Sequence, residues 1–364
     1  MEELRCYGCG AIIQSEDEKK IGFVPKNALD RSQVLCKRCF RLKNYHQLQA
    51  TNLSDDDFLE ILNKIGEKDC LVVYLVDLFD FNGSLIQGLV RHINYNDVIV
   101  VGNKRDILPR SIKDTKIIHW LRRQLKLEGI KPLDVLLTSG KKNYHLDELM
   151  QMIDQYRKGR DVYVVGVTNV GKSSLINSLL KAYSDVQDNL ITTSEFPGTT
   201  LDLVPIEQDG YTIYDTPGIE NHHSVLTFLN SKDLKMVIPT KPIKPFVSQI
   251  YEDQSFAAAG LARLDIVVKG KASVVGYFSR SLSIHRGKLE NADNLWNKHL
   301  NEMLVPCLDT SMLTMHTFQA PKVTNEKLDV VIHGLGWFCI SGQIQDVYVR
   351  VHKGINVTFR KAMI

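Results

Sequence analysis

The stretch Gly166-Val-Thr-Asn-Val-Gly171-Lys172-Ser173 constrains the fold of this chain more than any other. It follows an apolar run typical of a strand, Asp161 to Gly166, and precedes a helical run that begins at Ser174. Glycines in such a loop let backbone amides face a phosphate, and the amino end of the following helix adds a favourable dipole. The spacing and its setting therefore predict a phosphate-binding loop in an α/β domain.

Each side chain of this loop has an expected role toward a nucleotide and its Mg²⁺ ion. Lys172 should bridge the β- and γ-phosphates, and the Ser173 hydroxyl should bind Mg²⁺. Gly166, Gly171 and Ser174 should complete the phosphate contacts.

Two further stretches fit the switches of a nucleotide-dependent enzyme. Asp215-Thr-Pro-Gly218 ends another apolar strand, so Asp215 should reach Mg²⁺ through water and the Gly218 amide should sense the γ-phosphate. Pro197-Gly-Thr-Thr200 lies between the phosphate loop and this strand, where a first switch belongs. Thr200 fits best as the remaining Mg²⁺ ligand.

Two stretches fit recognition of guanine. In Asn103-Lys-Arg-Asp106, the Asp106 carboxylate can accept from both donors on the guanine edge, which adenine cannot match. Asn103 should assist this selection, and Lys104 should lie along the plane of the base. The backbone of Ser139 and Gly140, in Thr138-Ser-Gly140, should approach the guanine oxygen. Together these stretches predict GTP and GDP as ligands.

The order of these motifs is rotated, because the base-reading stretches come before the phosphate loop rather than after it. Strand-like and helix-like runs alternate through the same region, which predicts a parallel sheet with its ligand loops at the carboxyl ends of the strands. The expected strands cover 70–77, 97–102, 133–138, 161–166 and 211–214, and the expected helices include 112–127 and 146–157. The fold expected here is a circularly permuted P-loop domain over residues 51–225.

The amino-terminal 50 residues carry two CxxC pairs, Cys6/Cys9 and Cys36/Cys39, separated by 26 residues. Each pair aims two thiolates at one point, so the four predict a closed, structural Cys₄ zinc site. Disulfides or a redox site are the competing interpretations. Cys70, Cys307 and Cys339 stand alone in apolar surroundings and are expected to be small core residues.

The carboxyl-terminal part, residues 226–364, is predicted to be a β-rich α+β domain. A helical stretch (225–234) and a proline-rich cationic linker (239–245) lead into strand-like runs at 264–269, 272–278, 328–332, 337–340 and 345–352, with a helix near 292–304. Basic residues on or beside these runs could hold RNA through its phosphates, and a platform for a partner protein is the alternative. They are Arg263, Lys269, Lys271, Arg280, Arg286 and Lys288.

Charge is distributed unevenly along the 364 residues. The net charge is +3 over residues 1–50 (nine basic against six acidic residues), −6 over 51–225 (19 against 25) and +6 over 226–364 (17 against 11). Two basic flanks suit contact with nucleic acid, although solvated faces would give the same distribution. Cations alternate with aromatic residues around the second CxxC, from Lys37 to His46, which fits either RNA contact or a short amphipathic helix.

The composition is that of a globular protein with two or three domains, since 44% of residues are hydrophobic and 24% are charged. The longest apolar run, near 71–76, is too short to span a bilayer, and the first residues do not resemble a signal peptide. We therefore expect a cytoplasmic protein without a membrane partner.

The chain resembles the circularly permuted GTPases, and most closely the YqeH family. Three features carry the resemblance: the Cys₄ module ahead of the permuted domain, the motif order, and Asp77-Leu-Phe-Asp80-Phe-Asn-Gly83-Ser84 after the first strand. The resemblance implies an assembly factor for the small ribosomal subunit or its rRNA, with an RNA-binding carboxyl-terminal domain. It also implies slow intrinsic GTP hydrolysis that potassium stimulates, with Asn169 as the matching potassium ligand.

Several residues near the phosphates bear on the rate of hydrolysis. Ile219 stands where a water-orienting Gln would follow the Asp-x-x-Gly stretch, so intrinsic turnover should be slow. Lys172, Thr200 and Asn169 are the expected catalytic residues, and a potassium ion at Asn169 would stabilise transition-state charge. Alternatively, Asn169 serves only the geometry of the turn. His222 and His223 lie just beyond the second switch, and solvated loop positions are the simpler interpretation for them.

Three functions remain open on the sequence. The first is a GTP-driven switch in assembly of the small ribosomal subunit. The second is a zinc-stabilised RNA-binding scaffold that scarcely turns GTP over, and the third is a regulator that docks on a protein. Because permutation places Gly218 about twenty residues before the cationic linker, we expect the second switch to act on the carboxyl-terminal domain.

Overall fold

The computed structural model places most of the chain in two compact units, each of which is described by itself. Unit 1 comprises Met1–Leu78, Ser84–Arg105 and Asp114–Glu220, and unit 2 comprises Phe79–Gly83, Asp106–Lys113 and Asn221–Ile364. The structure describes residues 4–6, 11–18, 20, 22–29, 34–37, 39–40, 52–53, 55–93, 95–183, 204–208, 210–308, 314–322 and 326–364.

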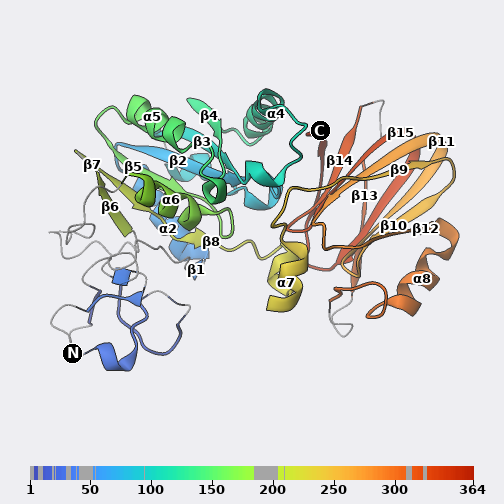
Figure 1. The fold of residues 1–364 in the computed structure, drawn as a ribbon, viewed down its shortest axis with the longest axis horizontal. Coiled ribbons are helices and arrows are strands. Elements are labelled where there is room, and N and C mark those ends of the chain that lie inside the picture. The colour runs from blue at the N-terminus through green and yellow to red at the C-terminus, as the bar shows by residue number, and fades with distance from the viewer. Residues whose placement is uncertain are drawn as a thin grey trace. The chain divides into compact units, whose positions relative to one another are not determined.

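Unit 1 is built on a six-stranded sheet with the strand order β4-β3-β2-β5-β7-β6 (Figure 1). Its strands are β2 (Cys70–Asp77), β3 (Asp97–Asn103), β4 (Asp134–Leu137), β5 (Asp161–Val165), β6 (Val204–Gln208) and β7 (Tyr211–Asp215). All neighbours are parallel except β6, which is antiparallel to β7. Every residue of β2 is buried, as expected for a central strand covered on both faces.

Helices connect these strands, as the alternating pattern predicted. They are α2 (Asp55–Gly66), α3 (Leu89–Ile93), α4 (Asp114–Leu127), α5 (Leu146–Arg157) and α6 (Lys172–Tyr183). A two-residue strand, β1 (Asn52–Leu53), pairs in parallel with β8 (Gly218–Ile219). Short 3-10 turns occur at Lys26–Ala28, Asn82–Ser84, Arg105–Ile107, Gly140–Lys142, Val225–Phe228 and Leu289–Asn291.

Unit 2 is built on an eight-stranded antiparallel sheet with the order β12-β10-β11-β15-β14-β16, to which β13 adds on β15 and β9 adds on β11 (Figure 1). The strands are β9 (Phe246–Ile250), β10 (Gln254–Ala258), β11 (Ala262–Phe278), β12 (Ile284–Lys288), β13 (Met315–Gln319), β14 (Leu328–Ile332), β15 (Gly336–His352) and β16 (Val357–Lys361). Its helices are α7 (Ser231–Val237) and α8 (Ala292–His299).

Two long strands, β11 and β15, replace the four shorter ones that the sequence predicted. They pair over most of their 17 residues, with irregular register between Val267 and Ala272. Gly342 has a φ of 105°, and a Cβ there would lie 2.7 Å from the Cα of Ala272. Glycine therefore marks a bulge within a continuous strand here, whereas the sequence suggested a turn between two strands.

The core of unit 2 encloses a buried charge cluster around Asp265 as well as aromatic and aliphatic side chains. Asp265 accepts hydrogen bonds from Ser255, Arg263 and Arg350, and Arg263 also pairs with Asp293 of α8 at 2.7 Å. Arg263 is 4% exposed. The expectation that it offers its charge to RNA is therefore wrong, because its guanidinium holds two carboxylates of the protein itself.

The predicted proline-rich linker is anchored within unit 2. The Ile243 amide donates to the Ile107 carbonyl at 2.8 Å, and Arg280 Nε donates to the Pro242 carbonyl at 2.6 Å. Within the described part of the chain, no helix is long and apolar enough to cross a membrane.

Candidate nucleotide-binding site

The phosphate loop lies between β5 and α6, as the sequence predicted. Asn169 and Gly171 adopt left-handed backbone conformations, with φ of 64° and 94°. A Cβ on Gly171 would lie 2.5 Å from Nδ2 of Asn103, so only glycine fits at this approach of two loops. The loop therefore makes the tight, glycine-dependent turn that a phosphate loop requires before its helix.

Lys172 begins α6 and is 8% exposed. Its Nζ donates to the carbonyls of Gly166 at 2.5 Å and Val167 at 3.2 Å. The ammonium thus lies inside the curve of the loop, where a β- or γ-phosphate would accept its hydrogen bonds in place of these carbonyls.

A cavity of about 250 Å³ opens over this loop. It is lined by the phosphate-loop residues Val167–Asn169 and Gly171–Ser174, by Lys104 and by Asp215–Gly218. Three predicted groups, the phosphate loop, the second switch and Lys104, therefore meet at one site at the carboxyl ends of the strands.

The second switch is held against the phosphate loop. The Thr168 amide donates to the Ile219 carbonyl at 2.7 Å, and a Cβ on Gly218 would lie 2.9 Å from Lys172 Nζ and 3.0 Å from the Thr168 amide. An alanine at this position would therefore crowd the Lys172 ammonium and the Thr168 backbone. Asp215 is 2% exposed and lines the same cavity.

The donors for a magnesium ion fit this cavity. Ser173 and Asp215 both line it, and hydroxyl and carboxylate oxygens are hard ligands that Mg²⁺ prefers. These two residues would hold the ion, whose charge would neutralise that of the phosphates. Thr200, the third expected ligand, and the rest of the first switch lie outside the described residues.

Asn103 joins three loops of unit 1 through its buried side chain. Its Nδ2 donates to the Val170 carbonyl at 2.8 Å, and its Oδ1 accepts from the Gly140 amide at 3.2 Å and from Thr138 Oγ1 at 3.4 Å. Both ends of the amide are thus engaged by protein groups. The sequence predicted that Asn103 assists recognition of the base. It did not predict that the side chain also connects the base-reading loops to the phosphate loop.

The Ser139-Gly140 loop packs on the start of α6. A Cβ on Gly140 would lie 2.8 Å from the Cα of Leu175, and the Gly140 carbonyl accepts from Ser178 Oγ at 2.7 Å. The Ser139 amide donates to the Tyr144 carbonyl at 3.3 Å. Only glycine fits against the helix here, which the sequence did not reveal because the contact spans distant residues.

Lys104 pairs with a carboxylate that the sequence had not connected to it. Its Nζ lies 2.6 Å from Oδ2 of Asp77, at the end of β2. Lys104 has a φ of 64°, and Asp106 is half-buried in the 3-10 turn Arg105–Ile107.

Three of the four predicted zinc ligands converge in the amino-terminal part. The Sγ atoms of Cys6, Cys36 and Cys39 lie within 4.8 Å of one another, and all three residues are buried. The Cys36 amide donates to Cys6 Sγ at 3.1 Å, a bond that favours a thiolate. These three cysteines are not joined in disulfides, so their geometry fits Zn²⁺; Cys9 lies outside the described residues.

The lone cysteines behave as the sequence predicted in two of three cases. Cys70 and Cys339 are buried, and burial raises the pKa of the Cys70 thiol to about 12, so this thiol stays protonated. Cys307 is only partly buried, and its Sγ contacts Asn301 Oδ1 at 2.6 Å.

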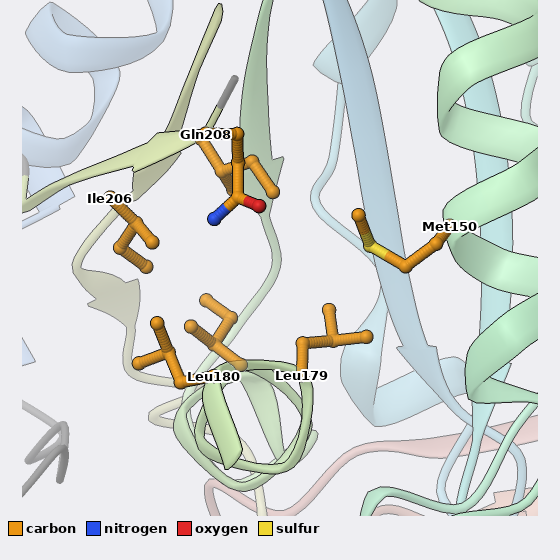
Figure 2. A pocket seen from close by; sticks show the side chains of 7 residues that line it. Met150, Leu179, Leu180, Ile206 and Gln208 are labelled. Carbon is orange, nitrogen blue, oxygen red and sulfur yellow. The ribbon is translucent and has the colours of Figure 1, made fainter. Parts of the chain in front are cut away.

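A second, much smaller cavity of about 20 Å³ lies beside α6. Figure 2 shows Met150, Leu179, Leu180 and Ile206 around it, with Gln208 at its edge. Its lining is apolar apart from Gln208, and a cavity of this size has room for only about one water molecule.

Comparisons with known proteins include two matching family models and a solved structure with limited similarity. Residues 271–363 match a family model described as "YqeH-like, C-terminal", and residues 161–259 match one described as "50S ribosome-binding GTPase". A crystal structure of YlqF from T. maritima shares 22% identity with a TM-score of 0.31, covering 51% of this chain and 66% of that chain.

Two curated relatives extend over nearly the whole sequence. "NO-associated protein 1, chloroplastic/mitochondrial" of Arabidopsis thaliana is 29% identical over 92% of this chain and 69% of its own length. "Uncharacterized protein YqeH" of Bacillus subtilis is 46% identical over 100% of both chains. The chain, with its permuted motif order and its phosphate-loop site, therefore belongs to the YqeH family of GTPases.

Proposed function

We propose that this GTPase is a switch in ribosome assembly, acting on the small subunit or its rRNA, and that its second switch acts on an RNA-binding carboxyl-terminal domain. The proposal keeps the expected cytoplasmic location and the three-part division of the chain at residues 50 and 225. It also keeps the nucleotide and magnesium roles assigned to the site residues, including Thr200.

The observation that carries the proposal is the segment Asn221–Phe228, which we call the exit segment because it follows the second switch. The Val225 amide donates to the His333 carbonyl at 2.9 Å, and the Asn356 amide donates to the His223 carbonyl at 3.0 Å. The exit segment begins three residues after Gly218 and is bonded to the turn between β14 and β15 and to the turn between β15 and β16. A displacement of Gly218 would therefore pull on a segment that the carboxyl-terminal sheet already holds.

Side chains strengthen this attachment. His223 Nδ1 lies 3.0 Å from the Gly354 carbonyl, and the ring of Phe228 packs against His352 with centroids 5.2 Å apart. These contacts favour the interpretation of His223 as a loop residue that anchors the exit segment. They do not favour a role for it at the phosphates.

Exposed cations support the RNA-binding part of the proposal. Lys269 and Lys271 are exposed at the bulge of β11, and Arg286 and Lys288 are exposed on β12. Tyr251 is 69% exposed, with Lys271 Nζ 6.0 Å from its ring centroid. Ammonium groups beside an accessible ring suit phosphate contact and base stacking.

Co-sedimentation of the full chain with purified small and large ribosomal subunits, in GTP, GDP or no nucleotide, tests the proposal. Both subunits are needed because the matching GTPase family is described as binding the 50S ribosome. We expect GTP-dependent binding to the small subunit. Added salt should weaken it, because binding to phosphates releases counterions and this release is less favourable at high salt. Binding only to the large subunit, or equal binding in all nucleotide states, would contradict the proposal.

A matched pair of variants adds a control. Lys172→Ala should abolish the GTP dependence of sedimentation, whereas Lys181→Ala, at an exposed position on the same helix, should keep it. If Lys172→Ala binds subunits as the unchanged protein does in GTP, the scaffold function with little turnover is favoured instead.

The potassium part of the proposal has its own test. The Asn169 side chain is exposed and its backbone is in the left-handed conformation, which suits either an ion ligand or a turn residue. Asn169→Gly keeps the left-handed backbone and removes the side-chain oxygen. We expect faster hydrolysis in KCl than in NaCl for the unchanged protein and equal rates for this variant. If potassium still stimulates hydrolysis fully in Asn169→Gly, the Asn169 side chain is not a potassium ligand and serves only the geometry of the turn.

A further inference from the structure

The last residue of β2, Asp77, lies beside the base-reading loop and is 6% exposed. In the parallel pairing of β2 with β3, Asp77 is the register partner of Asn103, and the next amide, of Leu78, donates to the Asn103 carbonyl at 3.1 Å. This register places the carboxylate next to Lys104. Asp77 begins the stretch that supported the family resemblance, yet no step of nucleotide binding described above uses it.

The Asp77 carboxylate forms an ion pair with Lys104, whose Nζ lies 2.6 Å from its Oδ2. Lys104 is 28% exposed and Asp77 only 8% exposed, counting side chains alone. The lysine therefore extends from the wall of the nucleotide cavity inward to a fixed acceptor. A short bond between an ammonium and a carboxylate is stronger than a bond between neutral groups.

Asp77 is itself held by a buried hydrogen-bond chain. Its amide donates to Ser84 Oγ at 3.0 Å, the Tyr74 hydroxyl donates to the Ser84 carbonyl at 3.3 Å, and the Ile86 amide donates to the Tyr74 hydroxyl at 2.9 Å. Ser84 and Tyr74 are 2% and 0% exposed. The backbone of Asp77, from which the carboxylate extends, is thus fixed by the sheet and by the segment that begins at Ser84.

We propose that Asp77 is a positioning residue for guanine nucleotides, which holds the Lys104 side chain extended so that its stem can lie along the base. The proposal rests on the role of Lys104 in the proposed function. Asp77 acts through Lys104 and does not touch the nucleotide.

The physical reason lies in the flexibility of lysine. A free lysine has four rotatable side-chain bonds and loses much rotamer freedom when it is ordered on a ligand. Here the ion pair orders the side chain before the nucleotide arrives, so less entropy is lost on binding. The φ of 64° at Lys104, together with the Arg105 amide bond to the Thr138 carbonyl at 2.9 Å, fixes the backbone at the same place.

A double-mutant cycle on the full chain tests the proposal, with Asp77→Asn, Lys104→Met and both together. Fluorescent GDP is titrated to obtain Kd, and GTP hydrolysis is measured for KM and kcat. We expect Asp77→Asn to raise Kd about tenfold, equivalent to about 1.4 kcal/mol. KM for GTP should rise similarly while kcat stays within about twofold, because uniform binding is lost. The double variant should bind no more weakly than Lys104→Met alone.

Asp134→Asn is the matched control, since Asp134, the first residue of β4, also pairs with a cation: Arg122 of α4 lies 2.6 Å from its carboxylate. Its GDP affinity should not change. Asparagine preserves the shape of the Asp77 side chain, and circular dichroism before titration confirms that each variant is folded.

The outcomes separate this inference from the function on which it rests. If Lys104→Met leaves GDP affinity unchanged, the role of Lys104 itself is wrong. Suppose instead that Lys104→Met weakens GDP binding, while Asp77→Asn leaves it unchanged or strengthens it by removing a negative charge. Only the positioning role of Asp77 is then refuted. Additive losses in the double variant would also refute it, because Asp77 would then act independently of Lys104.

Discussion

Replacing Asn103 by alanine should destabilise unit 1 even when no nucleotide is bound. The side chain is 2% exposed and bonds the Val170 carbonyl, the Gly140 amide and the Thr138 hydroxyl. Alanine removes the donor and the acceptor together, so two backbone groups of different loops lose their partner at once. The same change is expected to weaken guanine binding, and the apo protein separates the two effects.

The magnitude follows from the three bonds. A buried group left without its partner costs about 1–3 kcal/mol, and the bonds to Val170 and Gly140, at 2.8 and 3.2 Å, are the well-formed ones. The third, at 3.4 Å, contributes little. Because water can enter part of the space, we expect the free energy of unfolding of unit 1 to fall by about 3 kcal/mol.

Hydrogen exchange measured by mass spectrometry in increasing urea provides the assay, because peptides from β3, β5 and α6 report on unit 1 alone. Asn297→Ala, at an exposed position on α8, is the control and should change stability by less than about 0.5 kcal/mol. If Asn103→Ala lowers the free energy of unfolding of unit 1 by less than about 0.5 kcal/mol without nucleotide, the Asn103 side chain does not hold the loops together.

Three further predictions concern unit 2 and the zinc site. Burial, reinforced by Arg360 and His223, lowers the pKa of His333 from 6.5 to about 4, so protonation favours the unfolded chain. The free energy of unfolding of unit 2 is therefore unaffected by His333 above about pH 6.5 and should fall by about 2 kcal/mol by pH 5. Urea unfolding at several pH values, followed by hydrogen exchange of β14 and β15, should show this decrease. His333→Gln should abolish the pH dependence, whereas His316→Gln, at an exposed position, should keep it. Gly334 and Gly210 share a φ of 79°, but a Cβ on Gly334 would lie 2.0 Å from Ser224 Oγ whereas one on Gly210 meets nothing within 4 Å. Gly334→Ala should therefore speed hydrogen exchange of the exit segment, through both backbone strain and the clash with Ser224. Gly210→Ala introduces the same backbone strain without a clash, so it should speed exchange of its own neighbours less. Equal effects of the two substitutions would contradict the clash. Cys36→Ser should abolish stoichiometric zinc measured by mass spectrometry, whereas Cys307→Ser should retain it; equal zinc in both would exclude the Cys₄ site.

Local patterns predicted unit 1 well. The strand 70–77 and the helix 146–157 have the predicted bounds, and the phosphate loop lies between its strand and helix as expected. Long apolar runs and amphipathic periods carry this information because each element buries one continuous face. The strand β6 was not predicted. A short strand at the edge of a sheet forms by pairing with its neighbour, here β7, and its own sequence carries little signal of that pairing.

Unit 2 was predicted less completely. β14 has the predicted bounds, but β9, β10, β12, β13 and β16 were missed, and β11 and β15 were each divided in two. Short strands in antiparallel sheets are defined by cross-strand partners that lie far away in sequence. Burial of Arg263 was also missed. Asp265 lies only two residues away, but the second carboxylate, of Asp293 in α8, comes into reach only in the folded domain.

The sequence by itself determined the chemistry of the nucleotide site and its permuted order, because phosphate and guanine recognition require particular residue types at fixed short spacings. Tertiary structure alone decided how these groups support one another. It placed Asn103 between three loops, Asp77 against Lys104, and the exit segment against the turns beside β14. Each of these contacts joins residues that are far apart in the chain, and only packing of the folded elements brings such groups within hydrogen-bonding distance.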